Sequence, residues 1–166
     1  MPKQLHSVWW IVYYIAEDSQ PRYLIIKRHA RSKKVERVAP KGKVEWNESP
    51  EMTCLREIKE ETWLNIQDLQ VHQKLGEVQI KNINFGQGFH EKEVTYYLVH
   101  YRGQPSSVDI QPVEGFIGVY KRATIQEIIG LILYPTMRDI FRKGHEHITK
   151  SQEKTSLPRS TPKRPS

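Results

Sequence analysis

The sequence predicts an α/β fold in which mixed strands pack with two or three helices. Apolar runs rich in β-branched and aromatic residues alternate with polar turns, and other segments show the spacing of amphipathic helices. Such a combination suits a sandwich of helices and a sheet. No internal repeat is visible, and a chain of 166 residues with 37% apolar content is long enough to bury one core.

The strands are indicated in chain order. Residues 8–15 and 23–27 are apolar, and the polar residues 17–21 between them predict a hairpin. Further strands are expected at 71–80, 94–101 and 116–120. The glycine-containing segment 84–90 predicts a loop.

Three helices are expected. The clearest begins near residue 50, where Ser49 is a good N-cap, Pro50 suits the first helical position and Glu51 favours the positive end of the helix dipole. Its apolar side, which we expect to pack on a core, consists of Met52, Leu55, Ile58 and Thr62. Two helices follow near the end of the chain, at 123–133 and 135–147.

The first helix carries three carboxylates on one face. Glu57, Glu60 and Glu61 are spaced i, i+3 and i+4, so their side chains are neighbours on a helix. Like charges at that spacing repel one another, whereas a hard divalent cation such as Mg²⁺ requires oxygen ligands at short range. The cluster therefore indicates metal-assisted chemistry on a phosphate, although a solvated acidic helix face would show the same spacing.

Composition limits the remaining classes of protein. There is no apolar run long enough to span a membrane, and we find no signal peptide pattern at the N-terminus. The single cysteine, Cys54, excludes an internal disulfide and fits a reducing cytoplasm. We interpret Cys54 as a packing residue of the first helix.

The net charge of +7 is concentrated in two segments. Residues 27–43 form a basic loop leading into the helix, where Lys and Arg would bind the oxygens of a polyphosphate substrate. Residues 150–166 are basic and rich in Pro, Ser and Thr, which predicts a disordered tail after a domain spanning 1–149. Both segments would also suit RNA, and a solubilising role is the simpler reading of the tail.

The segment from Gly42 to Leu64 resembles the Nudix box, Gly-x5-Glu-x7-Arg-Glu-U-x-Glu-Glu-x-Gly-U, in which U is a bulky apolar residue. The positions that match in register are Gly42, Glu48, Arg56, Glu57, Ile58, Glu60, Glu61 and Leu64. Trp63 departs from it, because it occupies the second glycine of the box.

The resemblance implies an α/β/α sandwich with a mixed sheet and the hydrolysis of a nucleoside diphosphate linked to another group. It implies Mg²⁺, with Mn²⁺ as a substitute, bound by Glu57, Glu60 and Glu61 and by a backbone carbonyl of Lys41 or Gly42. It also implies that Glu57 and Glu61 act in catalysis, with Glu57 as a possible base, and that Arg56 and Glu48 form the pair that orients the helix.

A further glutamate is expected to complete the site. Glu114, in a turn before the expected strand 116–120, matches a loop glutamate that often joins the metal shell in this family. Glu91 and Glu93 compete with it for the role of catalytic base, and the sequence does not rank the three.

Three segments resemble the diadenosine tetraphosphate hydrolase branch of the family. They are Pro40-Lys41-Gly42 before the box, the strand 92–98 and the terminal segment 134–145. We therefore expect ATP and AMP as products from diadenosine tetraphosphate. Tyr96 and Tyr97 alternate on a strand, so only one of them faces the site, and that one or Tyr134 would stack on adenine. The substrate contacts we expect are Arg28, Lys41, Lys92, Tyr97 and Tyr134.

Two alternatives remain open. The same carboxylates would serve an RNA 5′-pyrophosphohydrolase or a nucleoside triphosphate pyrophosphatase. A Nudix-like domain that binds a nucleotide without catalysis is the second, although such domains usually lose box carboxylates and none is lost here.

Four tryptophans stand where relatives usually have small or turn-forming residues: Trp9, Trp10, Trp46 and Trp63. A residue just past a helix end commonly adopts the left-handed conformation, which costs a non-glycine residue roughly 1–2 kcal/mol. One hypothesis is that UGA codons for glycine were read as tryptophan. Ordinary divergence is the other, and UGG at all four codons would decide for it.

Overall fold

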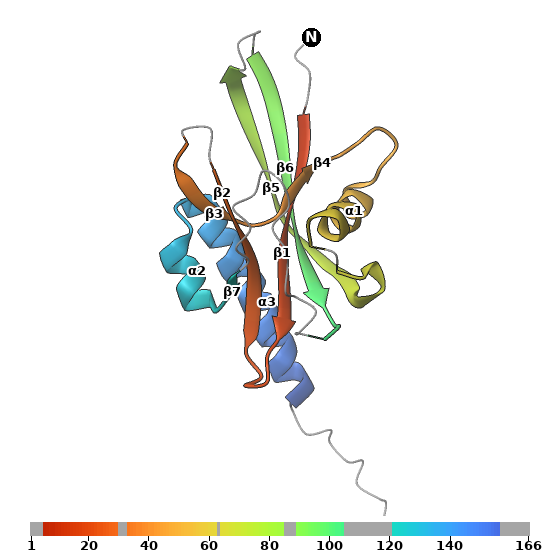
Figure 1. The fold of residues 1–166 in the computed structure, drawn as a ribbon, viewed down its shortest axis with the longest axis vertical. Coiled ribbons are helices and arrows are strands. Elements are labelled where there is room, and N and C mark those ends of the chain that lie inside the picture. The colour runs from red at the N-terminus through yellow and green to blue at the C-terminus, as the bar shows by residue number, and fades with distance from the viewer. Residues whose placement is uncertain (1–4, 30–32, 63, 85–88, 105–120, 157–166) are drawn as a thin grey trace, which may run out of the picture.

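The computed structural model describes residues 5–29, 33–62, 64–84, 89–104 and 121–156 (Figure 1). Seven strands form one mixed sheet, in which the order β3-β2-β1-β6-β5 is extended by β4 beside β1 and β7 beside β2. The strands are β1 (Leu5–Ile15), β2 (Pro21–His29), β3 (Val35–Val38), β4 (Lys41–Lys43), β5 (Leu69–Asn84), β6 (Phe89–Tyr101) and β7 (Lys121–Ala123). The helices are α1 (Pro50–Thr62), α2 (Ile125–Leu131), α3 (Pro135–Ser156) and a short 3-10 turn, η1 (Ile66–Asp68).

Strand β1 is the centre of the sheet. It pairs antiparallel with β2 and β4 and parallel with β6, and the register places Trp9 opposite both Lys41 and Tyr96. Because side chains alternate along a strand, its odd-numbered residues face one side of the sheet and its even-numbered residues face the other. The predicted hairpin is confirmed, since β1 and β2 pair antiparallel around the turn.

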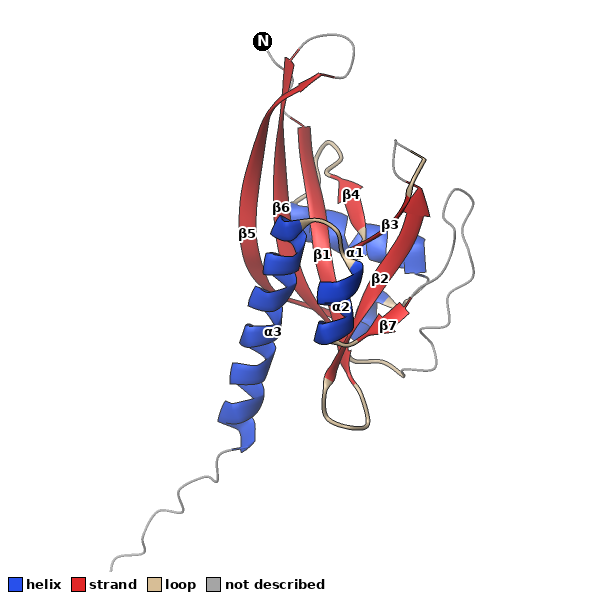
Figure 2. Ribbon diagram, turned by 90° about the vertical axis from the view of Figure 1, so that its left-hand side faces the viewer, coloured by secondary structure: helices blue, strands red, loops and turns tan. Residues whose placement is uncertain are grey.

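A hydrophobic core lies on each face of the sheet. Trp9, Ile11 and Tyr13 pack with residues of α2 and α3, whereas Val8, Trp10 and Val12 pack with Cys54 and Ile58 of α1. Figure 2 shows α2 and α3 in front of the sheet, with α1 behind it. The predicted α/β/α sandwich is confirmed. Within the residues described, no helix has both the length and the apolar character that crossing a bilayer requires.

Several boundaries differ from the sequence prediction. Helix α2 is shorter than the expected 123–133 because Thr124 is its N-cap and forms a capping box with Glu127. Helix α3 continues to Ser156, so residues 150–156 are helical and the expectation of a disordered tail from residue 150 is wrong for them. The predicted loop 84–90 is too long at both ends, because β5 runs to Asn84 and β6 begins at Phe89. Residues 85–88 lie outside the described residues. The expected strand 116–120 also lies outside them.

The basic segment 27–43 is not the loop that its charge suggested. It contains the end of β2, all of β3 and all of β4. Strand β3 also reverses the usual burial pattern: Val35 is 41% exposed, whereas Glu36 is 4% exposed. The physical reason is the cross-strand partner, because Arg28 of β2 lies directly opposite Glu36.

Candidate active site

Helix α1 is capped at its N-terminus and packs on the sheet along one side. The Ser49 hydroxyl accepts a hydrogen bond from the Met52 amide at 3.2 Å, as expected of an N-cap. Thr53, Cys54 and Ile58 are fully buried, so the packing role expected for Cys54 is confirmed. Met52 was expected to pack but is 57% exposed, because the helix turns Thr53 and Cys54 toward the sheet in its place.

Arg56 joins the helix to the preceding loop. Its Nε donates to Glu48 Oε1 at 2.7 Å, and Glu48 Oε2 accepts the Thr53 hydroxyl at 2.7 Å. The hydrogen bond from Arg56 is the main reason that the pKa of Glu48 lies below its ordinary value. The Arg56 Nη2 also donates to the backbone carbonyl of Lys43 at 3.4 Å. Glu48 and Arg56 are thus brought together in the pairing that the resemblance implies.

The same guanidinium group gathers two of the three carboxylates. Nη1 of Arg56 lies 2.9 Å from Glu57 Oε1 and 3.3 Å from Glu60 Oε2. Two carboxylates that meet at one nitrogen atom are able to converge on one cation. Glu61 belongs to the same helix, but its side chain lies outside the part that the structure describes.

The Glu57 side chain lies in close contact with the backbone of β4 at Gly42. A Cβ atom added to Gly42 would lie 2.5 Å from Glu57 Cδ and 2.7 Å from Oε1, so only glycine leaves room for this carboxylate. Burial raises the pKa of Glu57, and Arg56 opposes the effect without cancelling it. A carboxylate with a raised pKa is better suited to accept a proton near neutral pH.

The chemistry of these donors fits a hard divalent cation. Carboxylate oxygens and a backbone carbonyl are the ligands that Mg²⁺ takes in proteins. Among side chains that the structure describes, no group of three or more His, Cys, Asp and Glu is close enough to hold a metal ion. Two of the expected ligands lie outside the described side chains. They are Glu61 and, in the segment 105–120, Glu114.

A hollow of about 690 Å³ adjoins these carboxylates on the outer side of α1. It is lined by Met52, Leu55, Arg56, Lys59, Glu60 and Ile66. Its wall is mostly apolar, and the exposed Met52 side chain forms part of that wall. An apolar surface therefore borders the carboxylate face.

A second group of side chains lies on the opposite face of the sheet, around Trp9. The Arg28 guanidinium carbon is 5.6 Å and the Lys41 Nζ is 5.0 Å from the centre of the Trp9 ring. Both distances are in the range of cation–π contacts. Tyr96 packs on the same ring at a centroid distance of 6.3 Å. Arg28 and Lys41, which were predicted separately, are thus brought together over one aromatic ring.

Glu36 connects this group to Tyr134, the residue that precedes α3. Its carboxylate accepts the Arg28 Nε at 2.7 Å through Oε1 and the Tyr134 hydroxyl through Oε2. Tyr134 itself is 45% exposed. Neither Glu36 nor Trp9 was predicted at the site, and Tyr96 was predicted only as the alternative to Tyr97. For Trp9 and Tyr96 the available signal was the alternation along β1 and β6, which cannot be used until the register is known.

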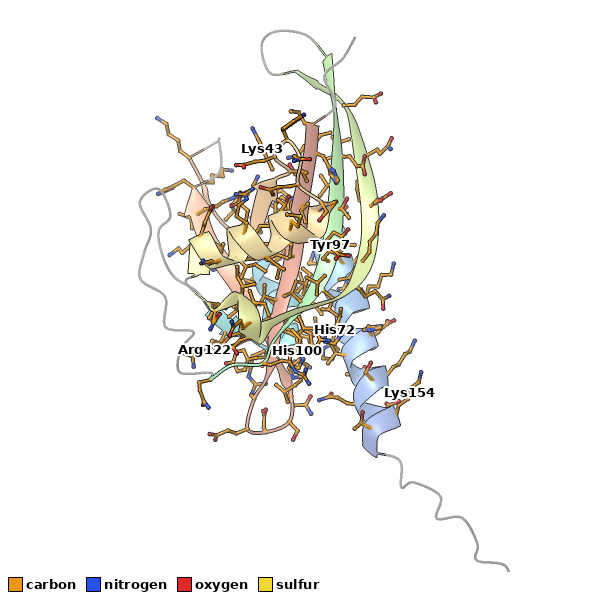
Figure 3. The ribbon with its side chains drawn as sticks, turned by 90° about the vertical axis from the view of Figure 1, so that its right-hand side faces the viewer. Lys43, His72, Tyr97, His100, Arg122 and Lys154 are labelled. Carbon is orange, nitrogen blue, oxygen red and sulfur yellow. The ribbon has the colours of Figure 1, made fainter. Side chains whose placement is uncertain are left out.

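The remaining predicted residues lie elsewhere. Tyr97 is 8% exposed and packs in the core beneath α1, where Figure 3 labels it. Lys92 pairs with Leu5 where β6 runs beside the start of β1. Glu93 Oε1 lies 3.8 Å from His6 Nε2, and Glu91 is exposed. The structure therefore places Tyr96, and not Tyr97, on the face that carries Trp9 and the two cations.

Comparisons with known proteins support the fold and the family. The NUDIX domain family matches residues 5–143. The chain is similar to a crystal structure of a C. elegans Ap4A hydrolase binary complex, with a TM-score of 0.70 and 19% identity over 88% of this chain and 98% of that one. A MutT protein from Methanosarcina mazei Go1 has a TM-score of 0.61 and 21% identity, covering 89% and 96% of the two chains.

A third structure is the NUDIX domain of Shewanella oneidensis NrtR complexed with ADP ribose, with a TM-score of 0.62 and 18% identity over 89% of this chain and 90% of that one. Identities this low show the shared fold alone. A comparison with curated protein sequences finds no match. Because the family match covers most of the chain and includes Gly42, Arg56 and the α1 carboxylates, this chain belongs to the Nudix hydrolase family.

Proposed function

We propose that this protein hydrolyses a phosphoanhydride bond of a nucleoside polyphosphate with the help of Mg²⁺, and that the substrate is a dinucleoside polyphosphate such as diadenosine tetraphosphate, which gives ATP and AMP. The observation that carries the proposal is the meeting of Glu57 and Glu60 at Arg56 beside Gly42. The fold shared with the C. elegans Ap4A hydrolase supports the choice of substrate.

The carboxylates of α1 have distinct roles in the proposal. Glu57, Glu60, Glu61 and the Gly42 carbonyl would hold the divalent ion, and Glu114 would join them. When bound, such an ion lowers the pKa of water and neutralises charge on phosphate oxygens. A carboxylate near the bound ion would accept the proton of the attacking water, with Glu57, Glu91, Glu93 and Glu114 as the competing candidates. Glu48 acts through Arg56, which it holds in the position that gathers the carboxylates.

The cations on the Trp9 face would bind the phosphate chain. Arg28 and Lys41 stand over the same ring, and Lys41 precedes Gly42 directly, so the phosphate contacts begin one residue from the carboxylate face. Lys92 would add charge from the beginning of β6. Tyr134 is the exposed aromatic side chain of this group, and stacking on a base contributes roughly 1–3 kcal/mol. We assign no substrate contact to Tyr97, because it is buried under α1.

A triphosphorylated RNA end or a nucleoside triphosphate is the second candidate substrate. The observation that favours it is the exposure of Lys33 and Lys34, which precede β3, and of Lys43 at the end of β4. Exposed lysines beside a phosphate site would bind the backbone of a longer nucleic acid.

The test is a panel of dinucleoside polyphosphates, nucleoside triphosphates and 5′-triphosphorylated RNA, each with Mg²⁺. We expect ATP and AMP from diadenosine tetraphosphate, whereas pyrophosphate from RNA would favour the alternative. Glu61→Gln should lower the rate at least ~100-fold because it removes a metal-binding charge. Glu51→Gln, an exposed position in the first turn of the same helix, is the matched control. Nucleotide binding without turnover would show a binding domain and contradict the proposal.

A further inference from the structure

Glu36 is an unusual residue for a short strand near a surface. It is 4% exposed, while its neighbour Val35 is 41% exposed, so a carboxylate occupies the position that an apolar residue usually takes. Burying a charge is unfavourable unless the charge is paired and hydrogen-bonded. The location of Glu36 therefore has to be explained by the groups that it binds.

Both carboxylate oxygens are used, and the partners come from two distant elements. Arg28 on β2 donates its Nε to Oε1 at 2.7 Å, and Tyr134, which immediately precedes α3, donates its hydroxyl to Oε2. Burial raises the pKa of Glu36, but the hydrogen bonds from Tyr134 and Arg28 outweigh it, so the group remains ionised. Hydrogen bonds to an ionised acceptor are roughly twice as strong as neutral ones.

The two partners are the groups that the proposed function assigns to different ends of the substrate. Arg28 lies over Trp9 next to Lys41, where it would meet phosphate oxygens. Tyr134, with 45% of its surface exposed, would meet the base. Because both are bound to one carboxylate, the span between the cation and the aromatic ring is fixed.

We propose that Glu36 is a positioning residue that holds Arg28 and Tyr134 at a fixed separation and so sets the distance between the base and the phosphate that the site accepts. The inference rests on the proposed function and adds to it. Glu36 touches no substrate in this scheme. It acts on binding through its two partners, so its loss should affect KM and leave kcat nearly unchanged.

The experiment compares steady-state hydrolysis of diadenosine tetraphosphate by the wild type and by Glu36→Gln, which keeps the side-chain volume. The amide carries no charge and has one acceptor oxygen instead of two, so the ionised acceptor that Arg28 and Tyr134 share is lost. We expect KM to rise about 10-fold with kcat within about 2-fold of the wild type. The control is Asp18→Asn, which neutralises another Arg–carboxylate pair, Asp18 with Arg22 at 2.6 Å, in the turn between β1 and β2. Its KM should not change.

A double-mutant cycle separates positioning from a general loss of stability. In a Tyr134→Phe background, Glu36→Gln should raise KM by a smaller factor than in the wild type, because one of its two partners is already lost. If Glu36→Gln raised KM by the same factor in both backgrounds, the proposal that Glu36 holds Tyr134 as well as Arg28 would be overturned. An unchanged KM for Glu36→Gln, or a loss confined to kcat, would overturn the role of Glu36 and leave the proposed function intact. If the wild type turned over no nucleoside polyphosphate at all, both would fall.

Discussion

Replacing Gly42 with alanine tests the geometry of the carboxylate face most directly. The added Cβ would lie 2.7 Å from Glu57 Oε1 and 2.5 Å from Cδ, whereas an ordinary contact begins at 3.4 Å. The Glu57 carboxylate must therefore move by about 1 Å, and a displacement of that size lowers a catalytic rate about 100-fold. The fold should tolerate the change, because the atoms that must move are at the end of the Glu57 side chain and not in the backbone.

The assay is Mg²⁺-dependent hydrolysis of diadenosine tetraphosphate, with thermal unfolding of each variant measured in parallel. Gly130→Ala is the matched control, because a Cβ at Gly130 meets nothing within 4 Å and alanine favours a helix. We expect Gly130→Ala to keep full activity and Gly42→Ala to lose most of it at a similar melting temperature. Full activity in Gly42→Ala would refute either the contact between β4 and Glu57 or the need for Glu57 in catalysis.

Three further outcomes are expected. Glu48→Ala removes the 2.7 Å partner of Arg56, so the carboxylates lose their fixed gathering point and kcat should fall about 10-fold or more, which initial-rate kinetics would show. Chelation of divalent ions should abolish turnover, and Mg²⁺ or Mn²⁺ should restore it; activity in excess chelator would contradict metal dependence. His100 stacks on Tyr13 at 4.5 Å, and burial, with smaller contributions from His72 and Arg102, lowers its pKa to about 4. Between pH 6.5 and pH 4 the unfolded chain binds more protons at this position, so stability falls as the pH decreases, by about 1 kcal/mol after allowance for solvent screening. Urea unfolding at pH 7 and pH 4.5 measures this loss of stability, which should be smaller in His100→Phe than in the wild type by the part that His100 contributes. An identical loss in both proteins would contradict the prediction.

The residues of the carboxylate site were predictable because the signal is local. Arg56, Glu57 and Glu60 lie within one and a half turns of a helix, and a helical period fixes their relative positions without any knowledge of the fold. Glu48 precedes them by a short loop, and its bond to Arg56 follows from the same resemblance. The rotation of α1 about its axis was harder to predict. Burial of Thr53 and exposure of Met52 depend on the sheet surface that the helix meets.

The grouping of residues on the Trp9 face was not predictable, because it depends on strand register, although Arg28, Lys41 and Tyr134 were each predicted. Period-two alternation shows that Tyr96 and Tyr97 face opposite sides, but only the pairing of Trp9 with Tyr96 shows which of them faces the cations. Glu36 was hidden for a related reason, since its burial makes sense only with Arg28 opposite it on β2. In the sequence, Glu36 is the one acidic residue of the basic segment 27–43, and nothing local indicates that it is buried.

The tryptophans show a similar limit. Trp10 is fully buried under α1 and Trp9 is 8% exposed, whereas Trp46 is 94% exposed and Trp63 lies outside the described residues. Among the described residues, the indole nitrogens of Trp9 and Trp10 are buried without a hydrogen-bond partner. An unpaired buried donor costs about 1–3 kcal/mol. Packing favours tryptophan at both positions and the unpaired nitrogens disfavour it, so inspection of the codons remains the test of recoding.

Strand β4 is the element that makes one site from two faces of the sheet. Its register opposite β1 turns Lys41 toward Trp9 and places Gly42 beside Glu57, on the side of α1. Consecutive residues of a strand face opposite sides, so the dipeptide Lys41-Gly42 meets the Trp9 face on one side and the α1 carboxylates on the other. Lys43 then binds Arg56 through its carbonyl. A shift of β4 by one residue would place a side chain where Glu57 lies and turn the Lys41 side chain away from Trp9. Because that single register carries both halves of the site, changes in β4 should impair metal-dependent turnover and phosphate binding together, whereas changes confined to α1 or β3 should impair only one of them.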